Sequence, residues 1–128
     1  MTRTLHARFT VTSADPVPLP HEDWVGAFLM RKSFTAGIVG ESELHFVFSG
    51  DEATGRGYVA IERITGRLDD GSEGSVVVQH MGSDGPNPFP FAGHIIPGSG
   101  TSGWSHLGGA AVIEHDDEGA YFRFDLDD

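Results

Sequence analysis

The sequence predicts an all-β fold of about eight strands in a single domain, residues 1–128. Segments of alternating apolar and polar residues are separated by turn residues at hairpin spacing, and no segment keeps a helical period beyond one turn. The chain also contains 18 glycines, which suit the bulges and sharp corners of a strongly curved sheet. Small chains of this kind close into antiparallel barrels or fold as sandwiches, and we expect a barrel.

The N-terminal part predicts one clear strand and an irregular connection. Leu5–Thr12 alternates apolar and polar residues, which is typical of a half-buried strand. Ser13–Pro20 contains three prolines, which lack the N–H that a ladder needs, so we expect a loop. His21–Trp24 is compatible with one helical turn, after which Trp24 plugs the barrel end or packs under the loop.

Two further strands precede the centre of the chain. Gly26–Ala36 predicts a strand whose register stays undecided, because Lys32 shares a face with Phe28 and Met30. Ser42–Ser49 is clearer, since Leu44, Phe46 and Phe48 fall on one face of the strand.

A β-hairpin over Arg56–Met81 forms the predicted centre of the barrel. Its first arm is rich in β-branched residues, and Asp69–Ser72 supplies the Asp-Gly pair that a tight turn needs. One face of this arm carries two arginines and a threonine, so we expect this face to be exposed to solvent. The opposite face should point inward, and it carries Tyr58, Ala60, Glu62, Ile64 and Leu68.

The C-terminal part predicts three more strands. Gly82–Pro90 has three prolines and reads as a lid-like connection. Phe91–Pro97 is a short strand, followed by a glycine-rich turn. Gly108–His115 is apolar on both faces, and Gly119–Leu126 alternates cleanly.

Composition excludes several classes of partner. The formal charge of −11 repels phosphate backbones and anionic lipid, so we expect neither nucleic acid nor a membrane as partner. There is no cysteine, no apolar region of a signal peptide and no run long enough to span a membrane, which predicts a cytoplasmic protein. The same charge opposes association, so we expect a monomer or a homodimer formed through outer apolar residues such as Val59–Ile61.

Known cofactor motifs are not fulfilled. The loop Pro97–Thr101 lacks the lysine and the following helix of a phosphate-binding loop, which favours a wide turn at the barrel rim. Glu62, His80 and His94 could supply three metal ligands, but their spacing is unspecific. We therefore expect no metal and no cofactor.

The inward-facing carboxylate of Glu62 is the main indication of chemistry, and its burial should raise its pKa. Glu62 and Tyr58 lie on one face of a strand, and His80 lies on the paired strand, so the three could act on one ligand. Alternatively, Glu62 pairs with an arginine such as Arg123 or is exposed. The aromatic residues Phe46, Phe48, Phe122 and Phe124 form either plain core or the wall of a ligand cavity.

Five glycine-centred motifs occur in order along the chain: Lys32-Ser-Phe-Thr-Ala-Gly37, Tyr58-x-Ala-x-Glu-Arg-x-x-Gly66, Gly74-Ser-x-x-x-Gln-His80, Pro97-Gly-Ser-Gly-Thr101 and Leu107-Gly-Gly109. Together they resemble a bacterial family of unknown function, DUF3224, whose fold is similar to the allene oxide cyclase barrel. The resemblance implies a closed, antiparallel, eight-stranded barrel with an apolar interior, and it implies no agreed activity. Departures at Pro86–Phe91 and at Ser102–Leu107, which carries Trp104, would border the barrel mouth.

Two functions are compatible with such a barrel. The first is a cofactor-independent cyclase or isomerase for an apolar small molecule, with Glu62 as acid/base, Tyr58 as hydrogen-bond donor and His80 as second proton partner. The second is a non-catalytic carrier or sensor that uses the same cavity. In both, the ligand-binding wall consists of Phe46, Phe48, Trp104, Phe122 and Phe124.

Overall fold

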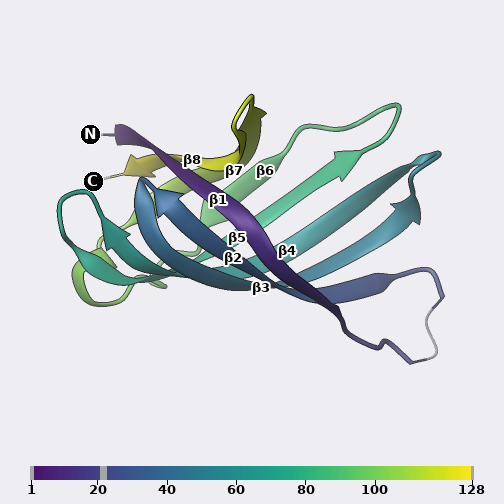
Figure 1. Cartoon of the computed structure of the whole chain (residues 1–128), viewed down its shortest axis with the longest axis horizontal. Coiled ribbons are helices and arrows are strands. Elements are labelled where there is room, and N and C mark those ends of the chain that lie inside the picture. Colours follow the sequence, from purple (N-terminus) through teal and green to yellow (C-terminus); the bar gives the residue numbers. More distant parts are fainter. Residues whose placement is uncertain (1, 21–22, 128) are drawn as a thin grey trace.

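The computed structural model describes residues 2–20 and 23–127, which form one closed antiparallel barrel of eight strands in sequential order (Figure 1). This confirms the predicted fold class. The two chain ends lie side by side, because Thr2 pairs with Asp127. Among the described residues no helix is long and apolar enough to cross a membrane. The elements are β1 (Thr2–Pro16), β2 (Gly26–Ala36), β3 (Ile38–Asp51), β4 (Gly55–Leu68), β5 (Glu73–Asp84), β6 (Ala92–Ile95), the 3₁₀ helix η1 (Ser102–Trp104), β7 (Gly108–Asp116) and β8 (Gly119–Asp127).

The predicted central hairpin is formed by β4 and β5. Gly71 in its turn has φ +87°, the left-handed conformation that the Asp-Gly pair predicts. The inner face of β4 is also as predicted, since Ala60, Glu62 and Ile64 are buried while Val59 and Ile61 are exposed. The alternation of the sequence therefore specifies which side chains enter the barrel.

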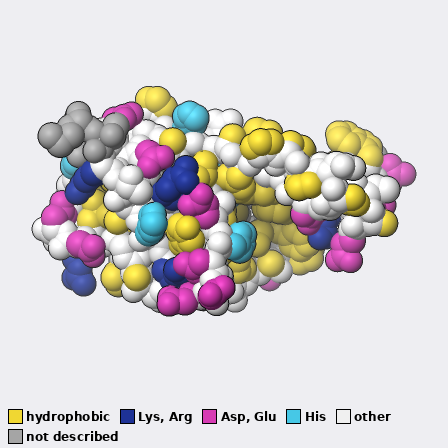
Figure 2. Space-filling model, turned by 90° about the horizontal axis from the view of Figure 1, so that it is seen from above, with side chains coloured by type: hydrophobic (Ala, Val, Ile, Leu, Met, Phe, Trp, Pro, Cys, Tyr) yellow, Lys and Arg dark blue, Asp and Glu magenta, His cyan; other side chains and the backbone are white. Residues whose placement is uncertain are grey.

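Unequal strand lengths leave one end of the barrel open. β8 pairs with β1 over Thr2–Arg8, and β6 pairs with β5 over Val78–Met81. Beyond those pairs, the second half of β1 and the strands β2–β5 continue as a curved wall on one side (Figure 1). Figure 2 shows hydrophobic side chains lining the hollowed part of this half of the molecule.

The other end of the barrel is filled by a packed apolar core. η1 and its flanking loop close this end, and the indole of Trp104 is buried there and donates to the carbonyl of Ser72 at 3.1 Å. The buried members of this core are Ala7, Phe9, Phe34, Ile38, Ile64, Leu68, Val76, Val78, Ile95, Trp104, Leu107, Ala111, Phe122, Phe124 and Leu126.

Several predicted boundaries are wrong. β3 begins at Ile38 instead of Ser42, and β5 continues to Asp84, into the predicted connection Gly82–Pro90.

The first strand is also longer than predicted, because β1 continues through Ser13 to Pro16 instead of ending at Thr12. Val17 donates its N–H to Ala27 on β2, so the nitrogen of the preceding Pro16 points to the opposite edge of the strand. At that edge, β1 has no ladder partner among the described residues beyond Arg8. A proline there removes no ladder hydrogen bond.

The predicted role of Trp24 is also wrong. The helical turn expected at His21–Trp24 lies partly outside the described residues, while Asp23 and Trp24 form a bend. Trp24 is 66% exposed and plugs nothing, although its carbonyl accepts a hydrogen bond from Ser49 at 2.6 Å. This tryptophan therefore lies at the surface of the open half.

Candidate functional site

A layer of buried polar side chains crosses the barrel between the packed core and the open end. It consists of Lys32 on β2, Ser42 on β3, Glu62 on β4 and His80 on β5, each less than a tenth exposed. All four occupy inward positions of neighbouring strands, where alternation would otherwise place apolar residues. Buried polar groups of this kind are stable only when they satisfy one another.

Glu62 is the centre of this polar layer. Its Oε1 accepts from the Lys32 ammonium at 2.9 Å and from Nε2 of His80 at 2.8 Å, while Oε2 accepts from Ser42 at 2.6 Å. The expected alternatives of an exposed Glu62 or a pair with Arg123 are wrong, since Arg123 binds Glu114 instead. The carboxylate is thus fully buried and fully hydrogen-bonded.

Lys32 is held in the barrel by aromatic rings as well as by the carboxylate. Its Nζ lies 4.0 Å from the ring centre of Phe9 and 4.8 Å from that of Phe122. A cation over the face of an aromatic ring is stabilised by the ring quadrupole. One carboxylate and two aromatic faces therefore replace the water that the Lys32 ammonium loses on burial.

His80 joins the carboxylate to Tyr58. Because the Glu62 carboxylate is an acceptor, neutral His80 carries its proton on Nε2 and leaves Nδ1 as an acceptor. Tyr58 lies with its hydroxyl 3.0 Å from that Nδ1, so the phenol donates to the imidazole. A continuous chain of hydrogen bonds runs from Lys32 through Glu62 and His80 to Tyr58.

The pKa of Glu62 differs from the predicted direction. Burial raises it, as expected, but the hydrogen bond from His80 and the charge of Lys32 outweigh burial and bring the pKa below its usual range. Burial lowers the pKa of His80 although Glu62 opposes the shift, and burial raises the pKa of Tyr58 well above its usual value. At neutral pH the layer therefore contains an ionised Glu62, a neutral His80 and a protonated Tyr58.

An aromatic pocket of about 340 Å³ lies beside this layer at the open end. Its rings pack on one another, with ring centroids 5.7 Å apart for Phe28 and Phe48 and 4.6 Å apart for Phe46 and Tyr58. The volume is at the lower end of the range for small-molecule sites. The aromatic pocket is lined by Phe28, Phe46, Phe48, Arg56, Gly57, Tyr58, Ser83 and Asp84.

Tyr58 belongs to both the aromatic pocket and the hydrogen-bond chain. Its ring lines the pocket, while its hydroxyl contacts His80. Phe91, from the connection after β5, covers this junction: its ring stacks 5.7 Å from His80 and lies 6.1 Å from Tyr58. A ligand in the pocket would therefore contact Tyr58, which is connected through His80 to the buried Glu62 carboxylate.

The structure separates the predicted site residues into two groups. It brings together Glu62, Tyr58 and His80, and it places Phe46 and Phe48 in the aromatic pocket beside them. The other three predicted ligand-binding residues do not line this pocket. Phe122 contacts Lys32 and His80 from the core side, and Phe124 and Trp104 lie deeper in the packed end: Trp104, Phe122 and Phe124 are all buried.

The metal site considered from sequence is not assembled. His94 pairs with Gln79 and is exposed, so it faces outward while His80 faces inward. Within residues 2–20 and 23–127, no group of three potential metal ligands is close enough to hold an ion.

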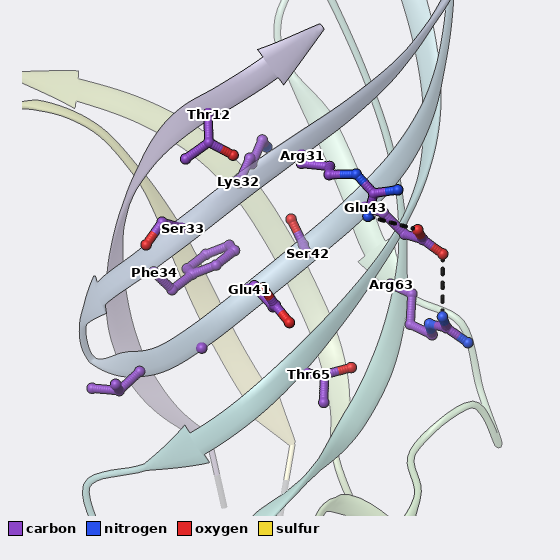
Figure 3. Close-up of a pocket in the computed structure, with 12 residues that line it drawn as sticks. Thr12, Arg31, Lys32, Ser33, Phe34, Glu41, Ser42, Glu43, Arg63 and Thr65 are labelled. Atoms are coloured by element: carbon purple, nitrogen blue, oxygen red, sulfur yellow. Dashed lines mark hydrogen bonds and ion pairs between the residues drawn. The ribbon is translucent and has the colours of Figure 1, made fainter. Parts of the chain in front are cut away.

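A larger hollow, about 680 Å³, lies on the outside of β2, β3 and β4 (Figure 3). Glu43 lies across its edge and accepts hydrogen bonds from Arg31 at 3.3 Å and from Arg63 at 3.1 Å. Exposed ion pairs of this type contribute little and are screened by salt. Because the hollow is lined mainly by solvated outward side chains, it is a weaker ligand site than the smaller aromatic pocket.

Sequence reasoning missed Lys32, Ser42 and Phe28 as parts of the site. A signal for Lys32 was present: it interrupts the inward series Phe28, Met30 and Phe34, as Glu62 interrupts that of β4. When one strand has a positive and another a negative side chain among its inward-facing apolar residues, the two predict a buried ion pair, provided that the register of both strands is known. From sequence alone the register of β2 stays undecided, because Lys32 shares a face with the apolar Phe28 and Met30.

Comparison with known proteins agrees with the fold. The family model described as "Protein of unknown function (DUF3224)" matches residues 5–127. A solved structure of a DUF3224-family protein of unknown function from Shewanella oneidensis MR-1 is similar, with TM-score 0.85 and 24% identity. The match covers 99% of this chain and 97% of that one. None of the curated proteins compared with the chain matches it.

Proposed function

The chain belongs to the DUF3224 family, and we propose that it binds a small apolar molecule in the aromatic pocket and performs acid–base chemistry on it. The observation that carries this proposal is the position of Tyr58, which lines the pocket and is hydrogen-bonded through His80 to Glu62. The reaction class that fits is a cofactor-independent isomerisation or cyclisation, which needs conformational restriction and a few polar groups.

The order of groups in the chain supports proton transfer. A carboxylate that hydrogen-bonds one nitrogen of an imidazole fixes its tautomer and stabilises the imidazolium that forms when the other nitrogen takes a proton. Here Glu62 accepts a hydrogen bond from Nε2, and Nδ1 accepts a hydrogen bond from the Tyr58 hydroxyl. A proton leaving a ligand can pass to the Tyr58 oxygen while the phenolic proton moves to His80.

A carrier or sensor is the alternative, and one observation favours it. Both carboxylate oxygens of Glu62 are already occupied by Lys32, Ser42 and His80, which is what a purely structural network requires. The predicted similarity of the fold to the allene oxide cyclase barrel does not separate the two functions, because one fold supports many activities.

A binding screen with a matched pair of variants tests the common part of both functions. A ligand that binds only the folded state raises the melting temperature by mass action. We expect small aromatic compounds to raise it in the wild type, with a smaller shift in Phe48→Ala and an unchanged shift in Val47→Ala. Phe48 lines the pocket, whereas the preceding residue, Val47, lies on the exposed outer face of the same strand.

The screen has a clear negative result. If no small apolar compound changes the melting temperature, or if Phe48→Ala and Val47→Ala respond alike, the aromatic pocket is not a ligand site. If compounds bind but no turnover is found with any binder, the carrier or sensor is the better description.

A further inference from the structure

We propose that the ligand of the aromatic pocket carries a hydroxyl or N–H group that donates a hydrogen bond to the oxygen of Tyr58. This inference rests on the proposed small-molecule binding and goes further by naming the chemical class of the ligand. It also reverses the role expected from sequence, in which Tyr58 donates to a carbonyl or hydroxyl of the substrate.

The direction of the hydrogen bonds in the polar layer determines this class. A phenol has one proton to donate and lone pairs that accept. Ionised Glu62 is an acceptor, so His80, which burial keeps neutral, donates from Nε2 and accepts at Nδ1. The single proton of Tyr58 is therefore committed to Nδ1 of His80, and only the lone pairs of its oxygen remain for a ligand.

Lys32 keeps this direction from reversing. A neutral, protonated Glu62 could donate to His80 and turn the whole chain around, which would free the Tyr58 proton. The Lys32 ammonium at 2.9 Å and the Ser42 hydroxyl at 2.6 Å both donate to the carboxylate and keep it ionised. The buried ion pair does not line the aromatic pocket, but it thus determines that Tyr58 offers the ligand an acceptor and not a donor.

Other polar groups in the pocket are less suited to this recognition. Asp84 accepts from both the backbone and the guanidinium of Arg56, at 3.0 and 3.1 Å. Ser83 exchanges hydrogen bonds with the backbone of Phe89. Arg56 and Asp84 pair near the start of β4, two residues before Tyr58 and closer to the open rim, where solvent competes for them.

Three probes of the same ring system test the proposal: 2-naphthol has a donor, 2-naphthaldehyde has an acceptor alone, and naphthalene has neither. Calorimetry on the wild type should show 2-naphthol binding about tenfold tighter than the other two, the value of one net hydrogen bond. Tyr58→Phe keeps the ring, so it should weaken 2-naphthol about tenfold and leave naphthalene unchanged. Asp84→Ala should keep the preference for 2-naphthol.

The outcomes separate this inference from the proposed function. If all three probes bind without a preference, or if the aldehyde binds tightest, the donor class is wrong while the pocket remains a ligand site. Loss of the preference in Asp84→Ala but not in Tyr58→Phe would also overturn it. If none of the probes binds, the proposed function and this inference both fail. The ranking on the wild type decides the question even if Tyr58→Phe does not fold.

Discussion

At the scale of single residues, the buried charge of Glu62 affects the stability of the fold in addition to its proposed role in catalysis. Glu62 is fully buried and is the counter-ion of Lys32, which is itself 4% exposed. A buried ion pair contributes little relative to an apolar pair of the same shape, but removal of one partner leaves an uncompensated charge. A substitution of Glu62 therefore affects folding before it affects turnover.

Glu62→Gln is expected to lower the free energy of unfolding by about 3 to 5 kcal/mol, because it leaves the Lys32 ammonium buried without a counter-ion. Urea denaturation measures this loss. The double variant Glu62→Gln/Lys32→Met should recover most of it, and Glu43→Gln, in an exposed pair, should change little. An additive double variant would show that the two side chains do not interact.

The charge-balanced double variant also separates folding from catalysis. Lys32→Met/Glu62→Gln keeps the shape of the layer and removes its titrating carboxylate. For an isomerase or cyclase, it should abolish turnover of a bound substrate while ligand binding at Phe46 and Phe48 persists. Turnover at the wild-type rate would exclude Glu62 from proton transfer.

His80 makes stability depend on pH in the acidic range. An unfolded histidine titrates at about pH 6.5, while burial lowers the pKa of His80 in the fold. Below pH 6.5 the unfolded chain therefore binds more protons, so the free energy of unfolding falls as the pH falls toward the folded pKa. Glu62, whose folded pKa is also lowered, adds a second loss in the range where carboxylates protonate.

The test compares the wild type with His80→Gln, whose amide does not titrate. Between pH 7 and pH 5, the free energy of unfolding should fall more steeply in the wild type than in the variant. Parallel slopes for the two proteins would mean that His80 does not stay neutral in the fold.

At the scale of elements, the hairpin β4–β5 shows two different reasons for glycine. Gly71 in the turn has φ +87°, and a Cβ there would meet no neighbour within 4 Å. Gly66 lies opposite Gly40 in the β3–β4 ladder, and a Cβ there would overlap the carbonyl oxygen of Val39. Gly71 is needed because its backbone is left-handed, and Gly66 is needed because two strands approach each other closely there.

These reasons predict unequal effects of alanine. Gly71→Ala should lower the free energy of unfolding by about 1 kcal/mol, the penalty of a left-handed non-glycine residue. Gly66→Ala should lower it by about 3 kcal/mol, since the two strands must separate. Chemical denaturation of both variants gives the order, and a larger loss for Gly71→Ala would contradict it.

The elements also show what sequence could predict. Alternation specified the inward faces of β4 and β8, and Phe122, Phe124 and Leu126 share the buried face of β8, because each of these strands has one buried and one more exposed face. Prediction failed where a residue that usually disfavours a strand or an inward position is accepted in this fold. The free edge of β1 admits Pro16, and the ion pair admits Lys32 on an inward face.

The site was harder to predict than the strands. Glu62, Tyr58 and His80 were proposed as partners from shared faces and pairing, but the division between aromatic pocket and packed core depends on strand length. Phe48 lies where β6 and β8 have already ended, and Phe124 lies where the barrel is complete. Alternation alone gives both residues the same inward position, and only the three-dimensional lengths of the strands separate them.

At the scale of the whole molecule, the outer face of β3–β5 offers a surface for association. Val47, Val59 and Met81 pair across three strands, and Ile61 lies beside them, all at least partly exposed. Burial of such a patch favours dimerisation, while the charge of −11 opposes the approach of identical surfaces at low salt.

We predict a weak homodimer that strengthens with salt, and sedimentation velocity across protein and salt concentrations tests it. Val59→Lys should shift the equilibrium to monomer without changing ligand binding, since Val59 points away from the aromatic pocket. A monomer under all conditions would reject the predicted dimer.

The division of the barrel into a packed end and a ligand-binding end is tested most directly by nuclear magnetic resonance. A titration of the ¹⁵N-labelled protein with 2-naphthol maps the backbone amides that respond to the ligand. We expect the largest changes at Gly57, Tyr58 and Ser83, which line the aromatic pocket, and little change at Trp104 and Leu107 in the packed end. Changes confined to the packed end, or to the outer hollow at Glu41 and Thr65, would contradict this assignment.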